Sequence, residues 1–165
     1  MMNMKRFLIA LSLLVAAVFA GCSIVSYSFS GTSIQPDVKT VTINYFEYKA
    51  LKVNPNLSND LTEAMRDKFR KLTKLEQVEM DGDLELQGEI TGYEVRAAAV
   101  TANEVAAQNR LTVTVKLKFT NRKFPEDDFE KDFSAYSDYD STNALDAVES
   151  TLCQEIIDKL VEDMF

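Results

Sequence analysis

The stretch RLTVTVKLKFT, residues 110–120, alternates polar and apolar side chains over its whole length. Successive side chains of a β-strand point to opposite faces of the sheet, so this alternation predicts a strand with one buried face. The turn at 121–127 contains Pro125 and leads into a second alternating stretch, residues 128–136. Two such stretches joined by a short turn predict an antiparallel hairpin.

One register of this hairpin suits both faces, and in it the paired residue numbers sum to 248. The apolar pairs on the core side are Val113–Ala135, Val115–Phe133 and Phe119–Phe129. On the other side Lys116 meets Asp132 and Lys118 meets Glu130, and such pairs contribute about 0.2–1 kcal/mol each. Lys131 falls opposite Leu117 on the core side, so this register requires its ammonium to reach water at the rim.

Further strands and two helices follow from the same periodicities. Alternation predicts strands at 38–46 and 84–95, with a β-bulge at Gly92, where the apolar residues change parity. Apolar residues at helical spacing predict one helix over 58–74 and another from Ser141 to the C-terminus.

Two weaker segments complete the chain. Residues 75–80 fit a short strand, and residues 97–109 are an Ala-rich connection. The elements together predict an α+β fold, a two-layer sandwich with two helices packed on one face of a mainly antiparallel four- to five-stranded sheet. The other face of that sheet is expected to be polar and open to solvent or a partner.

The N-terminus has the order of a secretory signal peptide. Lys5 and Arg6 precede the apolar residues 7–20, a run too short for an ordinary membrane-spanning helix. The run ends in Phe19-Ala20-Gly21-Cys22, which resembles the lipobox at which bacterial lipoprotein signals are cut and the cysteine is acylated. A plain secretory signal cut near Ala20 is the alternative.

The expected organisation is therefore a signal peptide over 1–21, a lipidated tether over 22–37 and a single α+β domain over 38–165. Without Lys5 and Arg6 the chain has 16 basic against 26 acidic residues, so the net charge of the mature protein is −10. Such a charge argues against nucleic acid as a partner.

Composition and motifs also speak against catalysis. The chain has no histidine, which removes the commonest general base and the commonest zinc ligand. It has no nucleophile elbow, phosphate-binding loop or calcium-binding loop, so we expect no enzyme, no cofactor and no metal. Cys153 lies within a helical pattern and is expected to be a small buried hydrophobe rather than a reactive thiol.

Five basic residues are candidates for contact with a partner or with phosphate groups: Arg110, Lys116, Lys118, Arg122 and Lys123. In one interpretation the carboxylates of the neighbouring strand neutralise the lysines. In the other these cations bind a ligand. Arg110 and Arg122, at the two ends of the long strand, have no predicted cross-strand partner and are the stronger candidates for contact.

Several stretches resemble the LptE family of lipopolysaccharide-assembly lipoproteins, in the form found in Bacteroidetes-type bacteria. The stretches, which accompany Cys22, are YSFSGTSI (27–34), LTEAMRDKF (61–69), GDLELQGEITGY (82–93), RLTVTV (110–115) and DYDS (138–141). The resemblance covers essentially the whole mature chain.

The resemblance implies a non-enzymatic outer-membrane lipoprotein that faces the periplasm. It implies a β-barrel partner of the LptD type, in whose lumen the protein sits as a plug. The role implied is to help that barrel assemble and deliver lipopolysaccharide to the outer leaflet.

Direct binding of lipopolysaccharide through basic residues is a further implication, but this chain is acidic and only Cys22 carries over residue by residue. Two other classes stay open, a lipid-anchored accessory of another envelope complex and a surface-displayed ligand-binding lipoprotein. Residues 23–26 lack the acidic run that marks surface export in Bacteroidetes-type bacteria, which favours the periplasmic side.

Overall fold

The computed structural model describes residues 34–98 and 107–165. Cys22, the expected signal peptide, most of the expected tether and most of the Ala-rich connection lie outside the described residues. The elements are β1 (Thr40–Ile43), β2 (Glu47–Tyr48), α2 (Leu57–Leu72), β3 (Glu76–Gln77), β4 (Leu84–Ala97), β5 (Gln108–Asn121), η2 (Pro125–Asp127), β6 (Phe129–Asp140) and α3 (Leu145–Met164).

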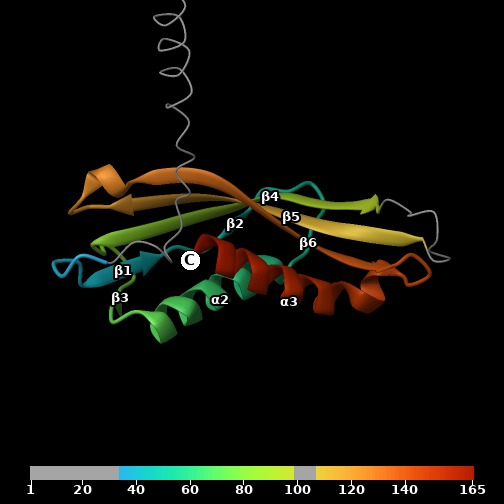
Figure 1. The fold of residues 1–165 in the computed structure, drawn as a ribbon, viewed down its shortest axis with the longest axis horizontal. Coiled ribbons are helices and arrows are strands. Elements are labelled where there is room, and N and C mark those ends of the chain that lie inside the picture. The colour runs from blue at the N-terminus through green and yellow to red at the C-terminus, as the bar shows by residue number, and fades with distance from the viewer. Residues whose placement is uncertain (1–33, 99–106) are drawn as a thin grey trace, which may run out of the picture.

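The strands form one mixed six-stranded sheet (Figure 1). Its order is β3-β1-β4-β5-β6, and β2 pairs with β4 beyond the end of β1. β4, β5 and β6 are antiparallel, whereas β1 runs parallel to β3 and β4, and β2 runs parallel to β4. The α+β class is confirmed. The sheet has six strands rather than the predicted four to five, and it is mixed: the three long strands are antiparallel, but the short strands β1, β2 and β3 pair in parallel. β1 and β3 are parallel because the helix α2 lies between them in the chain, and parallel neighbouring strands are usually joined by such a helical crossover.

The β5–β6 hairpin has the predicted register from end to end, with pair numbers that sum to 248. Lys131 lies opposite Leu117 as that register requires, and it is exposed. Its ammonium lies 4.8 Å from the centroid of the Phe133 ring, so the side chain covers apolar surface and keeps its charge in water.

β6 is longer than predicted, because it runs on to Asp140. The predicted strand ends at Tyr136, but Asp138-Tyr139-Asp140 belongs to β6 as well. Tyr139 faces Asn109 of β5 and is buried in the core, while Asp138 and Asp140 are exposed on the alternate face. The alternation of the strand continues through these three residues.

The long strand β4 contains the predicted bulge. Its pairing with β5 shifts register between Ile90 and Gly92, which leaves Thr91 without a direct partner. The bulge keeps Ile90 and Tyr93 on the same buried face although they are three positions apart.

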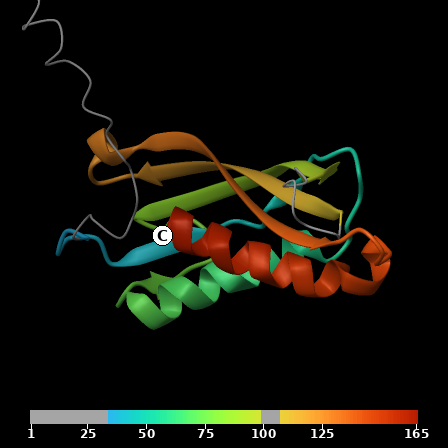
Figure 2. The ribbon, with the colours of Figure 1, turned by 45° about the vertical axis from the view of Figure 1, so that its right-hand side comes forward.

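Both helices cover the same face of the sheet (Figures 1 and 2). Their apolar stripes are buried, as predicted, at Leu61, Met65, Phe69, Leu152, Ile156 and Leu160. Full burial of each such side chain contributes about 1.5–3 kcal/mol. Leu72, predicted to belong to the stripe, is 60% exposed because α2 ends there.

α3 begins at Leu145, four residues later than the predicted start at Ser141. The carboxylate of Asp140 accepts hydrogen bonds from both the N–H (2.8 Å) and the hydroxyl (2.7 Å) of Thr142. This turn reverses the chain between β6 and α3 before the helix can start.

The predicted strand over 38–46 is shorter in the structure: β1 ends at Ile43, where the alternation of buried residues fails, and the separate strand β2 begins at Glu47. Continued alternation from Val41 and Ile43 would bury Tyr45, yet Tyr45 is 54% exposed and Phe46 is fully buried. The Phe46 ring occupies the space above Gly88, where a side chain would have stood. The N–H of Phe46 is bonded to the hydroxyl of Thr62 on α2 (3.1 Å), so β2 is turned toward the helix.

No helix within residues 34–98 and 107–165 has the length and hydrophobicity required to cross a membrane. The same residues contain no cluster of Cys, Asp or Glu side chains that could hold a metal ion.

Candidate functional site

The sheet face opposite the helices carries the candidate cations. It is lined by alternate residues of β4, β5 and β6, among them Glu85, Gln87, Glu89, Glu94, Arg110, Thr112, Thr114, Lys116, Lys118, Glu130, Asp132, Ser134, Tyr136 and Asp138. We call this surface the open face, because both described helices lie on the other side of the sheet. Most of the cations lie on the central strand β5, and carboxylates predominate on the two flanking strands.

Arg110 has a partner that the sequence interpretation did not assign. Its Nε and Nη2 donate to the two carboxylate oxygens of Asp138 at 2.7 and 2.8 Å. The guanidinium also stacks 3.6 Å from the ring centroid of Tyr136. These hydrogen bonds hold the pKa of Asp138 below its usual value. The hypothesis that Arg110 lacks a cross-strand partner is therefore wrong.

Lys116 lies between Glu89 of β4 and Asp132 of β6 in the register. Its ion pair is with Glu130, two residues along β6 from the predicted partner Asp132. The pair lowers the pKa of Glu130 and raises that of Lys116. Lys118 faces Glu130 across the strands as predicted, but it makes no ion pair with any described residue.

Arg122 and Lys123 lie beyond the end of the open face, in the turn after β5. Arg122 bridges Asp81 (2.7 Å) and Glu85 (2.9 Å), so the prediction that it has no partner is wrong. Its hydrogen bond lowers the pKa of Glu85. Lys123 lies 3.2 Å from a carboxylate oxygen of Asp83.

Asp83 itself ties the turn before β4 to the start of β1. Its Oδ2 accepts the N–H groups of Lys39 (2.7 Å) and Thr40 (3.1 Å). These backbone hydrogen bonds, with Lys123, lower the pKa of Asp83 to about 2. The cations of this turn therefore have a structural role that accounts for them.

The structure does not gather the five candidate cations into one site. Arg110 and Lys118 are separated by about 27 Å along β5 at about 3.4 Å per residue. Four of the five, Arg110, Lys116, Arg122 and Lys123, have a carboxylate within ion-pair distance. The sequence contained a signal for Arg110, because extending the predicted register by two residues pairs it with Asp138.

A polar cluster behind β4 was not predicted. The Tyr93 hydroxyl donates to the carboxylate of Glu149 and lies 4.0 Å from the Cys153 sulfur. The Asn54 side-chain amide donates to the same sulfur at 3.5 Å. Burial raises the pKa of both Tyr93 and Cys153. The predicted burial of Cys153 is confirmed, with 6% of the residue exposed.

Comparison with known protein families identifies the chain. The family model described as "LptE: Lipopolysaccharide-assembly" matches residues 38–165, the whole of the predicted domain. The chain belongs to the LptE family. This is a family of non-enzymatic lipopolysaccharide-assembly lipoproteins, so the prediction of no enzyme and the resemblance found in the sequence are both confirmed. A comparison with curated proteins gave no match.

Several solved structures are similar to this LptE-family chain at low sequence identity. A Xanthomonas campestris protein is 9% identical, with a TM-score of 0.53 over 80% of this chain and 86% of that one. Rare lipoprotein B from Shewanella oneidensis is 14% identical, with a TM-score of 0.45 over 73% and 90%. A minor lipoprotein from Acinetobacter baumannii is 15% identical, with a TM-score of 0.44 over 72% and 87%.

Proposed function

We propose that this LptE-family chain is an outer-membrane lipoprotein, anchored through Cys22 and facing the periplasm. Its two-layer α+β body acts as the plug and assembly partner of an LptD-type β-barrel. In that complex it helps to deliver lipopolysaccharide to the outer leaflet. The family membership supports the lipopolysaccharide-assembly role, and the lipobox-like sequence supports the anchor.

The observation that carries the plug role is the charge pattern of the open face. Each cation of β5 on this face is paired in register with a carboxylate of β6, and Lys116 also faces Glu89 of β4, whereas Arg110 faces Arg96 there. Two of these cations form ion pairs within the sheet, so the surface is strongly polar and carries both signs of charge. The interior of an outer-membrane barrel is polar as well. A polar sheet face with both signs of charge suits contact with such a wall and with the water inside it.

The same charge pattern disfavours binding of the phosphate groups of lipopolysaccharide to the open face. A phosphate group would have to displace Asp138 from Arg110 and Glu130 from Lys116. The displaced carboxylates would stay beside the anion and repel it. We therefore assign Arg110 and Lys116 to contact with the barrel rather than to binding of lipopolysaccharide. Lys118, which has no carboxylate to displace, is assigned to the same contact because it lies beside them on the open face.

Affinity purification tests the proposal. The tagged chain is recovered from detergent-solubilised outer membranes, and the co-purifying proteins are identified by mass spectrometry. We expect an LptD-type barrel in near-equal amount. Recovery of the intact lipoprotein alone, from cells in which that barrel is abundant, would refute the plug role and favour the ligand-binding alternative. Recovery with another envelope complex would favour the accessory role.

Charge variants then locate the contact. The exchange Arg110→Asp with Asp138→Arg keeps the ion pair of the open face but inverts its direction. If the barrel no longer co-purifies with this double variant, the open face contacts the barrel. Circular dichroism checks separately that the double variant is folded. Lys71→Glu, on the exposed surface of α2, is the matched control and should leave recovery unchanged.

The anchor is tested apart from the barrel. Cys22→Ser should abolish incorporation of labelled palmitate and release the chain from the membrane fraction. Stable anchoring requires more than one acyl chain, since one myristoyl-sized chain binds only weakly and reversibly. Unchanged labelling of the variant would refute acylation at Cys22.

A further inference from the structure

The outer edge of β6 is the long unpaired edge of the described sheet. β6 is last in the strand order, and its twelve residues contrast with the two residues of β3 at the opposite edge. Unpaired N–H and C=O groups along an edge strand are a template for another strand. Within the described part of the chain, no strand covers this edge.

The direction of the backbone groups of β6 follows from two hydrogen bonds. The N–H of Ser141, just past the strand, donates to Ala107 on the β5 side at 3.0 Å. The carbonyl of Tyr136 accepts from Lys159 of α3, on the outer side, at 2.7 Å. In an antiparallel ladder these directions alternate, so the odd-numbered residues of β6 bond to β5 and the even-numbered residues point outward.

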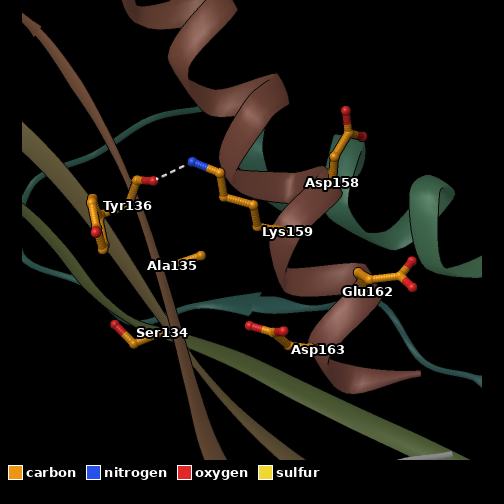
Figure 3. Close-up of a pocket in the computed structure, with 7 residues that line it drawn as sticks. All are labelled: Ser134, Ala135, Tyr136, Asp158, Lys159, Glu162 and Asp163. Atoms are coloured by element: carbon orange, nitrogen blue, oxygen red, sulfur yellow. Dashed lines mark hydrogen bonds between the residues drawn. The ribbon is translucent and has the colours of Figure 1, made fainter. Parts of the chain in front are cut away.

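A groove runs along the outward-pointing half of this strand (Figure 3). It has a volume of about 600 Å³ and lies between β6 and α3. Ser134, Ala135 and Tyr136 form one wall, and Asp158, Lys159, Glu162 and Asp163 of α3 line the other. The outward N–H and C=O of Ser134 and Asp132 have no hydrogen-bond partner among the described residues. A strand laid beside β6 would therefore find unused donors and acceptors.

Charge decides which strand fits. Asp132, on the open face, makes no ion pair with a described residue, and the same holds for Asp158 and Asp163 on the helix side. A strand added to β6 would present alternate side chains to these two sides. The cations at this edge are Lys131 and Lys159, and the carboxylates outnumber them. Basic side chains on the added strand would therefore meet carboxylates on both sides.

A second copy of this chain fits the edge poorly. β6 itself carries four carboxylates, at Glu130, Asp132, Asp138 and Asp140, against the single cation Lys131. Pairing of two β6 edges would bring like charges onto opposing positions, which is destabilising.

We propose that β6 is a docking edge, and that an extended, Lys- or Arg-rich segment of a partner protein adds to it as a further strand. The outward backbone groups of Asp132 and Ser134 form the ladder. Asp132 on one side, and Asp158 and Asp163 on the other, pair with the basic side chains. In the free protein Lys159 donates a hydrogen bond to the Tyr136 carbonyl, and an N–H of the added strand takes its place in the complex. The inference goes beyond the plug role, because it concerns the outward backbone groups of β6, at the border of the open face, and does not depend on which protein supplies the strand.

The test uses a fluorescein-labelled peptide of about ten residues that mixes Lys with Val and Thr, a length that spans most of the edge. The protein is the mature chain with Cys22→Ser, and binding is followed by fluorescence anisotropy. Ser134→Pro removes one outward N–H without removing a bond to β5, since proline is tolerated at such edge positions. Ser134→Val is the matched control, because it changes the side chain but keeps the N–H.

We expect the basic peptide to bind, and Ser134→Pro to weaken it roughly tenfold or more, since a hydrogen bond is lost and the ring blocks the ladder. Ser134→Val should stay within about twofold of the parent, and a peptide with Glu at every Lys position should not bind. The double variant Asp132→Asn with Asp163→Asn should bind the basic peptide more weakly than the parent does. This double variant and Ser134→Pro should both keep the circular dichroism spectrum of the parent.

Three outcomes would overturn the proposal. One is equal binding of the basic peptide to the parent and to Ser134→Pro. Another is no binding of that peptide at about 1 mM, the weak end of specific affinities. The third is a dimer in sedimentation that Ser134→Pro abolishes, since the edge would then belong to a second copy. Each leaves the plug role untouched, because that role is tested by recovery of the barrel.

Discussion

Replacement of Gly88 by alanine should destabilise the protein although it adds a single methyl group. A Cβ at this position would lie 2.2 Å from two ring carbons of Phe46, far inside van der Waals contact. The ring is fully buried, and the Phe46 N–H is held by Thr62 of α2. Because ring and backbone are both fixed, the added methyl must displace β2 or β4.

Overpacking of this kind costs about 1–3 kcal/mol of the free energy of unfolding. For a domain of this length each kcal/mol lowers the melting temperature by about 4 °C, so Gly88→Ala should melt roughly 4–12 °C below the parent. Urea titration of the mature chain with Cys22→Ser gives the free energy, and circular dichroism gives the melting temperature. Gly92→Ala is the control. Its Cβ would meet the Thr114 side chain at 3.1 Å, so we expect a loss of less than about 1 kcal/mol.

A double-mutant cycle separates this clash from other effects of the substitution. Phe46→Ala alone should cost about 3–5 kcal/mol, because it opens a cavity in the core. In the Gly88→Ala background the truncation also removes the clash, so the double variant should be more stable than the sum predicts by about 1 kcal/mol or more. Additive losses, or a Gly88→Ala variant as stable as the parent, would show that the contact between Phe46 and Gly88 does not set the position of β2.

Three further predictions concern titratable groups. Folding lowers the pKa of Asp83 to about 2, so its contribution to stability is complete above the pKa of an unfolded aspartate and is lost as the pH falls through about 2. The difference in free energy of unfolding between the parent and Asp83→Asn should therefore shrink between about pH 5 and pH 2 in urea titrations. Burial raises the pKa of Tyr93, so the phenolate absorbance at about pH 11 should be unchanged by Tyr93→Phe in the folded protein and reduced by it in urea. Burial also raises the pKa of Cys153, so its thiol should react with a disulfide reagent at least about a hundredfold more slowly in the folded mature chain with Cys22→Ser than in urea. Fast reaction without denaturant would contradict the inert role assigned to that thiol.

The β5–β6 hairpin could be predicted from the sequence because both of its faces impose a pattern. A slip of one residue would have turned Val113 and Val115 toward water, so a single register satisfied the alternation. The same register contained the Arg110–Asp138 pair. The prediction omits the Arg110–Asp138 pair because it ends the strand at Tyr136, before a run of aspartates and a serine that is typical of a loop. Polar residues on the exposed face of a strand and polar residues in a loop look alike unless the buried residues between them, here Ser137 and Tyr139, are followed.

The split between β1 and β2 could not be predicted in this way. Residues 38–46 alternate as one strand, yet Phe46 replaces Tyr45 in the core because the ring fits over Gly88. That contact joins residues forty-two positions apart and leaves no trace in local periodicity. The parallel direction of β1 and β3, in contrast, could have been predicted. A strand, a helix and a strand in succession usually give two parallel neighbouring strands.

The candidate site shows why a cluster of cations in a sequence is weak evidence for an anion ligand. Arg110 and Lys116 form ion pairs with Asp138 and Glu130 of the neighbouring strand β6, so their charges are used within the sheet. Among the described residues along the β6 edge, carboxylates without an ion pair (Asp132, Asp158 and Asp163) outnumber the cations Lys131 and Lys159, so the edge is acidic. A partner attracted to this edge must therefore carry the opposite charge, which an anionic glycolipid does not. The electrostatics of this edge thus favour contact with a basic protein segment over contact with an anionic lipid.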